Sequence, residues 1–92
     1  MNIVDFIPIG SKHAITREKL CNITGYPDRK IRELITLAGT EHIIINLQDG
    51  NGYFIPADDE KVLIERYYHQ EKSRLKANEK KVLMLERYLN EQ

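Results

Sequence analysis

The sequence predicts a mainly α-helical fold that contains one small β-hairpin and ends in a long helix. Three observations support this fold class. Two short stretches with apolar residues at helical spacing flank a turn that contains Gly25 and Pro27. A β-branched run and a cluster of turn-forming residues occupy 42–56. From Asp58 to Gln92 there is no glycine or proline, and strong helix formers dominate.

A chain of 92 residues with 41% hydrophobic and 30% charged content is typical of one soluble globular domain. We expect a module at 1–57 and a C-terminal helix at 58–92 within the same structural domain. Chains this short bury a limited share of their surface, so a partner subunit would add stability. The single cysteine, Cys21, excludes an intramolecular disulfide, and with no apolar run long enough to span a membrane we expect a cytoplasmic protein.

The first half of the chain predicts three helical segments. The apolar run Ile3–Ile7, which Pro8 follows, suits a first short helix packed on the core. Thr16 is the expected N-cap of the next helix, which would bury Leu20 and Ile23 and stop at Gly25.

Pro27 and Asp28 predict the start of a further helix, with Asp28 capping free amides and Gly39 closing it. Its apolar positions follow one stripe, at Ile31, Leu34, Ile35 and Ala38. Together with the preceding helix it predicts a helix-turn-helix unit. The residues expected to face outward are Arg29, Lys30, Arg32, Glu33 and Thr36.

The segment 42–56 predicts the β-hairpin. His42–Leu47 is β-branched and favours a strand, and Tyr53–Ile55 is the expected returning strand, ended by Pro56. The turn between them, Asp49-Gly50-Asn51-Gly52, is built of residues that tolerate positive φ.

The last segment predicts one long helix that begins at the acidic cluster Asp58-Asp59-Glu60. The apolar residues near its start, which we expect to pack on the module, are Val62, Leu63, Ile64, Tyr67 and Tyr68. A heptad seam follows the helix through Ile64, Tyr68, Glu71, Leu75, Asn78, Val82, Leu85 and Leu89.

The C-terminal part of this seam has no expected partner in the module, which predicts either self-association or a bend near 73–79. The dimerisation residues would be Leu75, Asn78, Val82, Leu85 and Leu89. A paired Asn78 would fix register and two-strandedness, and the alternative is plain solvent exposure on a monomeric helix.

The order of helix, turn, helix and hairpin over 14–56 resembles the winged helix-turn-helix family, in particular small winged-helix proteins of phages and prophages of Gram-positive bacteria. The residues that carry the resemblance are Ile15-Thr16-Arg17-Glu18-Lys19-Leu20 before Gly25, Arg29-Lys30-Ile31-Arg32-Glu33-Leu34-Ile35, and Gly52-Tyr53-Phe54-Ile55-Pro56. The resemblance implies that the second helix enters the DNA major groove and that the hairpin wing lies along the backbone or minor groove.

Carried over by position, the groove-facing residues would be Tyr26, Asp28, Arg29, Lys30, Arg32 and Thr36, and the wing residues Gln48, Asn51 and Tyr53. Arg17 and Lys19 on the preceding helix are lesser candidates for phosphate contact. The chain departs from the pattern at Leu47–Ile55, which contains no Lys or Arg and includes Asp49.

We therefore expect a homodimer, joined through the C-terminal helix, that binds double-stranded DNA as a transcriptional regulator or architectural factor. Lysine and arginine number 14, as do aspartate and glutamate, so any charge for DNA binding must be local. The alternative is a protein-interaction module without DNA contact. We expect no enzyme activity, cofactor, small-molecule substrate or metal, since no nucleophile with a base, cofactor loop or ligand spacing among His13, His42 and His69 is apparent.

Overall fold

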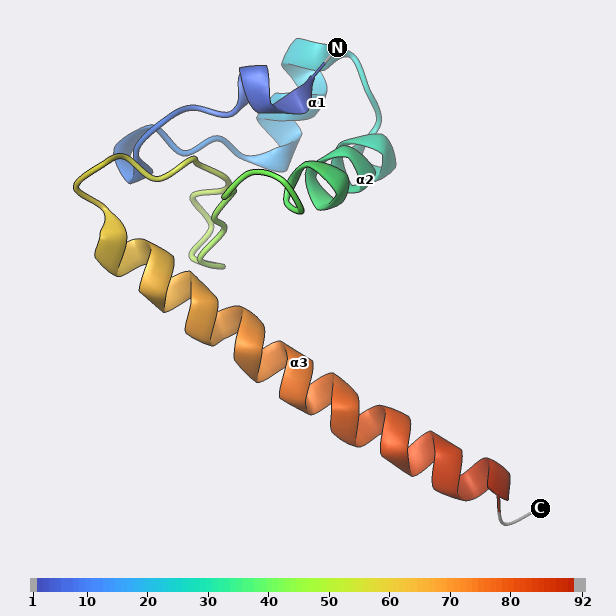
Figure 1. The fold of residues 1–92 in the computed structure, drawn as a ribbon. Helices are drawn as coiled ribbons and strands as arrows, with labels where there is room; N and C mark the ends of the chain where they lie inside the picture. Colours follow the sequence, from blue (N-terminus) through green and yellow to red (C-terminus); the bar gives the residue numbers. More distant parts are fainter. Residues whose placement is uncertain (1, 91–92) are drawn as a thin grey trace.

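A computed structural model describes residues 2–90. Two 3-10 helices, η1 (Ile3–Phe6) and η2 (Ser11–His13), precede three α-helices. These are α1 (Arg17–Thr24), α2 (Asp28–Ala38) and α3 (Lys61–Asn90). The segments before α3 form one compact module, and α3 leaves it as a straight rod (Figure 1).

The predicted helices α1 and α2 are confirmed. The ends of α1 are set by residues next to them in the sequence. The Thr16 hydroxyl accepts a hydrogen bond from the Lys19 amide at 3.2 Å, and Gly25 ends α1 with φ +77°. Leu20 is fully buried as expected, but Ile23 is 50% exposed. The predicted capping by Asp28 is wrong: no side chain caps α2, and Pro27 occupies the N-cap position.

The core lies entirely in the module. Ile31 of α2 is fully buried, and the rest of the predicted stripe packs half-buried beside it. The residues that form the buried cluster are Ile3, Ile7, Ile15, Leu20, Ile31 and Ile44. Helix α3 contributes no fully buried residue, so the module holds its own core.

The predicted β-hairpin and wing are wrong. Among residues 2–90 the only β pairing is three isolated bridges, Ile9 with Ile55, Ile15 with Tyr53 and Ile45 with Phe54. Successive residues of 53–55 thus bond to three different segments, and the two expected arms meet only at the Ile45–Phe54 bridge instead of forming a continuous ladder. The fold is mainly helical, with an irregular loop at 46–53 in place of a wing.

Gly52 shows why the returning arm leaves its expected partner. It has φ +97°, and a Cβ added there would lie 2.1 Å from the Ile15 carbonyl oxygen. The amide of Tyr53 donates to that same oxygen at 2.7 Å. The chain is therefore drawn against the segment before α1, a contact that β propensity within 42–56 cannot reveal.

Helix α3 begins three residues later than predicted, because the Glu60 carboxylate accepts hydrogen bonds from Ala57 and Ser11 just before the helix starts. It runs unbroken through 73–79, so the bend considered there is absent. Leu63, Ile64 and Tyr67 are half-buried as predicted, whereas Val62 and Tyr68 are exposed. The described part of the chain contains no helix with the length and apolarity to cross a bilayer.

Candidate nucleic-acid interface

The outward face of α2 carries the side chains that the sequence placed there. Arg29, Lys30, Arg32, Glu33 and Thr36 are all exposed. This follows from the stripe that starts at Ile31, which turns the opposite side of the helix to solvent. The first turns of α2 therefore present three cations.

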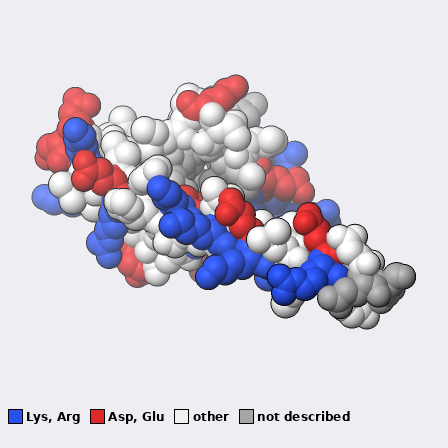
Figure 2. Space-filling view, turned by 60° about the horizontal axis from the view of Figure 1, so that its bottom comes forward, with Lys and Arg blue, Asp and Glu red and all other residues white. Residues whose placement is uncertain are grey.

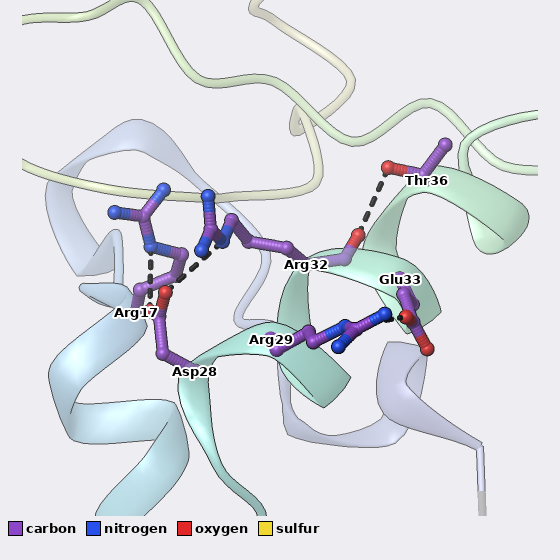
Figure 3. Close-up of polar contacts among 6 residues, drawn as sticks. All are labelled: Arg17, Asp28, Arg29, Arg32, Glu33 and Thr36. Atoms are coloured by element: carbon purple, nitrogen blue, oxygen red, sulfur yellow. Dashed lines mark hydrogen bonds and ion pairs between the residues drawn. The ribbon is translucent and has the colours of Figure 1, made fainter.

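Two of these cations are held in ion pairs by acidic neighbours (Figure 3). Asp28 bridges the two helices: its Oδ1 atom accepts a hydrogen bond from Arg17 Nε at 2.9 Å, and its Oδ2 atom lies 3.0 Å from Arg32 Nε in an ion pair. Arg29 lies 3.4 Å from Glu33. Such exposed pairs contribute only about 0–1 kcal/mol each, so an incoming phosphate can replace them.

Arg17 is placed at the junction of α1, α2 and the loop 46–53. The neighbouring Tyr53 hydroxyl, and after it the Asp28 carboxylate, raise the pKa of the Arg17 guanidinium above its ordinary value. Tyr53 also packs half-buried against the core. Arg17 therefore keeps its charge and is oriented by groups from two other segments.

A groove between α2, the loop and α3 brings together residues distant in sequence. Arg32 and Thr36 lie on one wall, Gln48 and Tyr53 on the second, and Arg74 on the third. Arg74, which sequence reasoning missed, lies 3.4 Å from Glu71 of the same helix. Its spacing from Tyr67, seven residues earlier on the half-buried face of α3, is the signal that would have found it.

Several predicted site residues lie outside this arrangement. Asn51 lines a different groove, with Lys12 and Leu63. Tyr26 packs against the core. Lys19 and Lys30 are exposed and make no ion pair within residues 2–90. Leu75, Asn78, Val82, Leu85 and Leu89, the predicted dimerisation residues, are all exposed on α3.

The zero net charge conceals a basic helix. Over Lys61–Asn90 there are eight Lys and Arg residues against four Glu, a net charge of +4 for α3. Basic side chains follow one another along α3 toward its C-terminal end in Figure 2. Helical spacing puts Lys72, Lys76, Lys80 and Arg87 on one side of the helix, a set we term the basic line.

Glu60 ties the start of α3 to the N-terminal segment. Its carboxylate accepts hydrogen bonds from the Ala57 amide at 2.9 Å and from the amide and hydroxyl of Ser11. The Ala57 amide, followed by the Ser11 hydroxyl, lowers the pKa of Glu60 below its ordinary value. Sequence reasoning assigned Glu60 to a helix cap and missed this long-range role.

No family model, curated protein or solved structure significantly matches this chain.

Proposed function

We propose that the protein binds double-stranded DNA through the outward face of α2, as a small transcriptional regulator or architectural factor. The observation that supports this proposal is the α1–α2 pair, in which the second helix exposes Arg29, Lys30 and Arg32 in its first turns. In helix-turn-helix proteins this part of the second helix contacts base edges and phosphates.

The chemistry of the side chains assigns different roles. The planar guanidinium groups of Arg29 and Arg32 can bind guanine O6 and N7 in a bidentate manner, while Lys30 and Arg17 suit phosphate oxygens. Asp28 holds Arg17 and Arg32 in place before binding, and a phosphate then competes with its carboxylate for them.

The local charge limits what one copy can do. Asp28 and Glu33 offset two of the three cations on the first turns of α2, which leaves a net charge of +1 over Asp28–Glu33. Few phosphates are neutralised by such a face, so affinity rises mainly by joining two copies. We therefore propose a homodimer as the DNA-binding species.

Fluorescence anisotropy with labelled duplexes at low salt tests the proposal. A chain with Arg29→Ala and Arg32→Ala should bind at least about tenfold more weakly, which corresponds to about 1.4 kcal/mol. The matched control, Lys61→Ala with Arg66→Ala, removes the same charge from exposed positions of α3. Absence of duplex binding, or equal losses in both variants, would refute the assignment to α2.

A second candidate is a protein-interaction module, and one observation favours it. Leu37 is 69% exposed on α2 and lines a shallow groove with Arg29, Glu33 and Thr36. Covering this leucine with an apolar side chain of a partner protein would remove its surface from water, which a DNA contact made by Arg29 and Arg32 does not require. If the protein binds DNA through α2, Leu37→Ser should change duplex affinity less than about twofold in the same titration. If the wild-type chain binds no duplex, the DNA-binding proposal fails and the protein-interaction module is the remaining candidate.

A further inference from the structure

The C-terminal part of α3 exposes an apolar seam that the module does not cover. From Lys72 to Asn90 every residue is exposed, and Leu75, Val82, Leu85 and Leu89 are 43–67% exposed. These residues, with Asn78, are spaced alternately by three and four, which places them on one face of the helix.

The charged residues on the two sides of this seam indicate which kind of partner helix would cover it. On one flank, Arg74 and Lys81 directly precede the seam residues Leu75 and Val82. On the other flank, Glu79 and Glu86 directly follow Asn78 and Leu85. All four charged side chains are exposed, and the exposed pair that Arg74 makes with Glu71 at 3.4 Å is weak enough for a partner carboxylate to replace it.

The spacing of these charges suits a second copy that runs parallel and in register. In such a pair, a residue on the first flank faces the residue five positions later on the second flank of the partner helix. Arg74 would meet the partner's Glu79, and Lys81 the partner's Glu86. The twofold symmetry repeats each contact, which gives four attractive pairs and no repulsive one among these residues.

An antiparallel pair is less favourable. In that arrangement each flank lies beside the same flank of the partner helix. When the seams overlap, Lys81 lies against the partner's Lys81 and Glu79 against the partner's Glu79, and both contacts are repulsive. The attractive contact is Lys72 with the partner's Glu86. The seam residues give the same preference. In register, the polar Asn78 lies beside the partner's Asn78, whereas an antiparallel pair sets it against an aliphatic side chain that offers its amide no polar partner.

We propose that residues 72–90 of α3 form a parallel, in-register, two-stranded coiled coil with a second copy of this chain. Val82 followed by Leu85 is the seam order that favours two parallel strands. The inference rests on the dimer of the proposed function and gives it an orientation. It is measured without DNA, so its failure is distinguishable from a failure of DNA binding.

Disulfide cross-linking of the full chain tests the orientation. In a Cys21→Ser background, Leu75→Cys should give a covalent dimer under mild oxidation, because the two thiols face each other across the seam. The matched control is Lys76→Cys, one position further around the helix, which should stay monomeric on a non-reducing gel. A mixture of Leu75→Cys and Leu85→Cys chains of different mass that links only between the two types would overturn the parallel arrangement, and a monomeric wild-type chain would overturn the dimer.

Sedimentation equilibrium tests the charge pairing. Glu79→Lys with Glu86→Lys should raise the dimer dissociation constant about tenfold or more, since attractive pairs become repulsive. Mixing this chain with one that carries Arg74→Glu and Lys81→Glu should restore association. The control, Lys76→Glu with Lys80→Glu, alters two charges away from the seam, and an equal weakening there would contradict the proposed pairing. Circular dichroism checks that each variant keeps its helix content.

Discussion

Asp28 is the central residue of the candidate interface, because its carboxylate forms ion pairs with arginines from two helices. Sequence patterns suggested an N-cap, since aspartate after proline at a helix start is a common cap. The pair with Arg17 became visible only with both helices in place, whereas the pair with Arg32 lies within α2 at i, i+4 spacing. Asp28 therefore joins α1 to α2 and also reduces the net positive charge of the candidate interface.

Replacing Asp28 with asparagine should strengthen duplex binding about threefold to tenfold, because a negative charge next to Arg17 and Arg32 is removed. Stability should fall by no more than about 2 kcal/mol, since the two ion pairs lost are both solvent-exposed and contribute at most about 1 kcal/mol each. Anisotropy and thermal denaturation measure the two effects. Asp58→Asn, an exposed acid outside the α1–α2 pair, is the control. Weaker binding by Asp28→Asn would show instead that orienting the arginines matters more than their charge.

Glu60 predicts a pH dependence of stability. Its lowered pKa means that the folded state binds a proton less readily than the unfolded state. The stabilisation is complete above the unfolded value of about 4.3 and is lost as the pH falls through the lower folded value. The stability difference between wild type and Glu60→Gln should thus be largest at neutral pH and shrink below about pH 4.

Urea denaturation at several pH values measures this difference. The control is Asp59→Asn, at the neighbouring exposed acid. Its difference in stability from wild type should not shrink at low pH as that of Glu60→Gln does. A difference for Glu60→Gln that stays constant down to about pH 3 would mean that the carboxylate charge is not what Ser11 and Ala57 stabilise.

At the scale of elements, local chemistry determined what could be predicted. Helices α1 and α2 follow from Thr16, Gly25 and the stripe at Ile31, all of which act within a few residues. The segment 46–55 was mispredicted because Tyr53 and Ile55 bond to Ile15 and Pro8, which lie far away in sequence. The groove with Arg74 was missed for the same reason, since it exists only where α3 crosses the loop.

Gly52 tests whether this close approach determines the loop. Gly52→Ala should destabilise the fold by about 3 kcal/mol or more, because positive φ and a clash with the Ile15 carbonyl combine. Gly50→Ala is the matched control: it has φ +85° but no atom within 4 Å of its added Cβ, so it should cost only about 1 kcal/mol. Equal losses in urea denaturation would refute the role of the contact.

At the scale of the whole molecule, the module before α3 and the helix α3 differ in both charge and shape. The segment before α3 contains six basic and nine acidic residues, whereas α3 has a net charge of +4. The module therefore holds the core and the candidate DNA-contacting face, and α3 supplies most of the positive charge and the apolar seam.

Two neighbouring leucines separate dimer formation from the general effects of a charged residue. Leu85→Asp places a charge in the seam, and it should dissociate the dimer and weaken duplex binding about tenfold or more. Leu83→Asp, 62% exposed but off the seam, should do neither. Light scattering and anisotropy on the same samples check both effects. A monomeric Leu85→Asp chain that binds DNA like wild type would mean that one copy suffices.

The basic line at Lys72, Lys76, Lys80 and Arg87 has a consequence for binding rates. Three of its residues, Lys76, Lys80 and Arg87, face away from the seam and Lys72 lies beside it, so pairing of two helices leaves most of the line in solvent on both chains. At physiological ionic strength its field extends about 8 Å before screening weakens it. A polyanion approaching the rod would be attracted before any contact with α2 forms, so added salt would slow the encounter more than it shortens the lifetime of the complex.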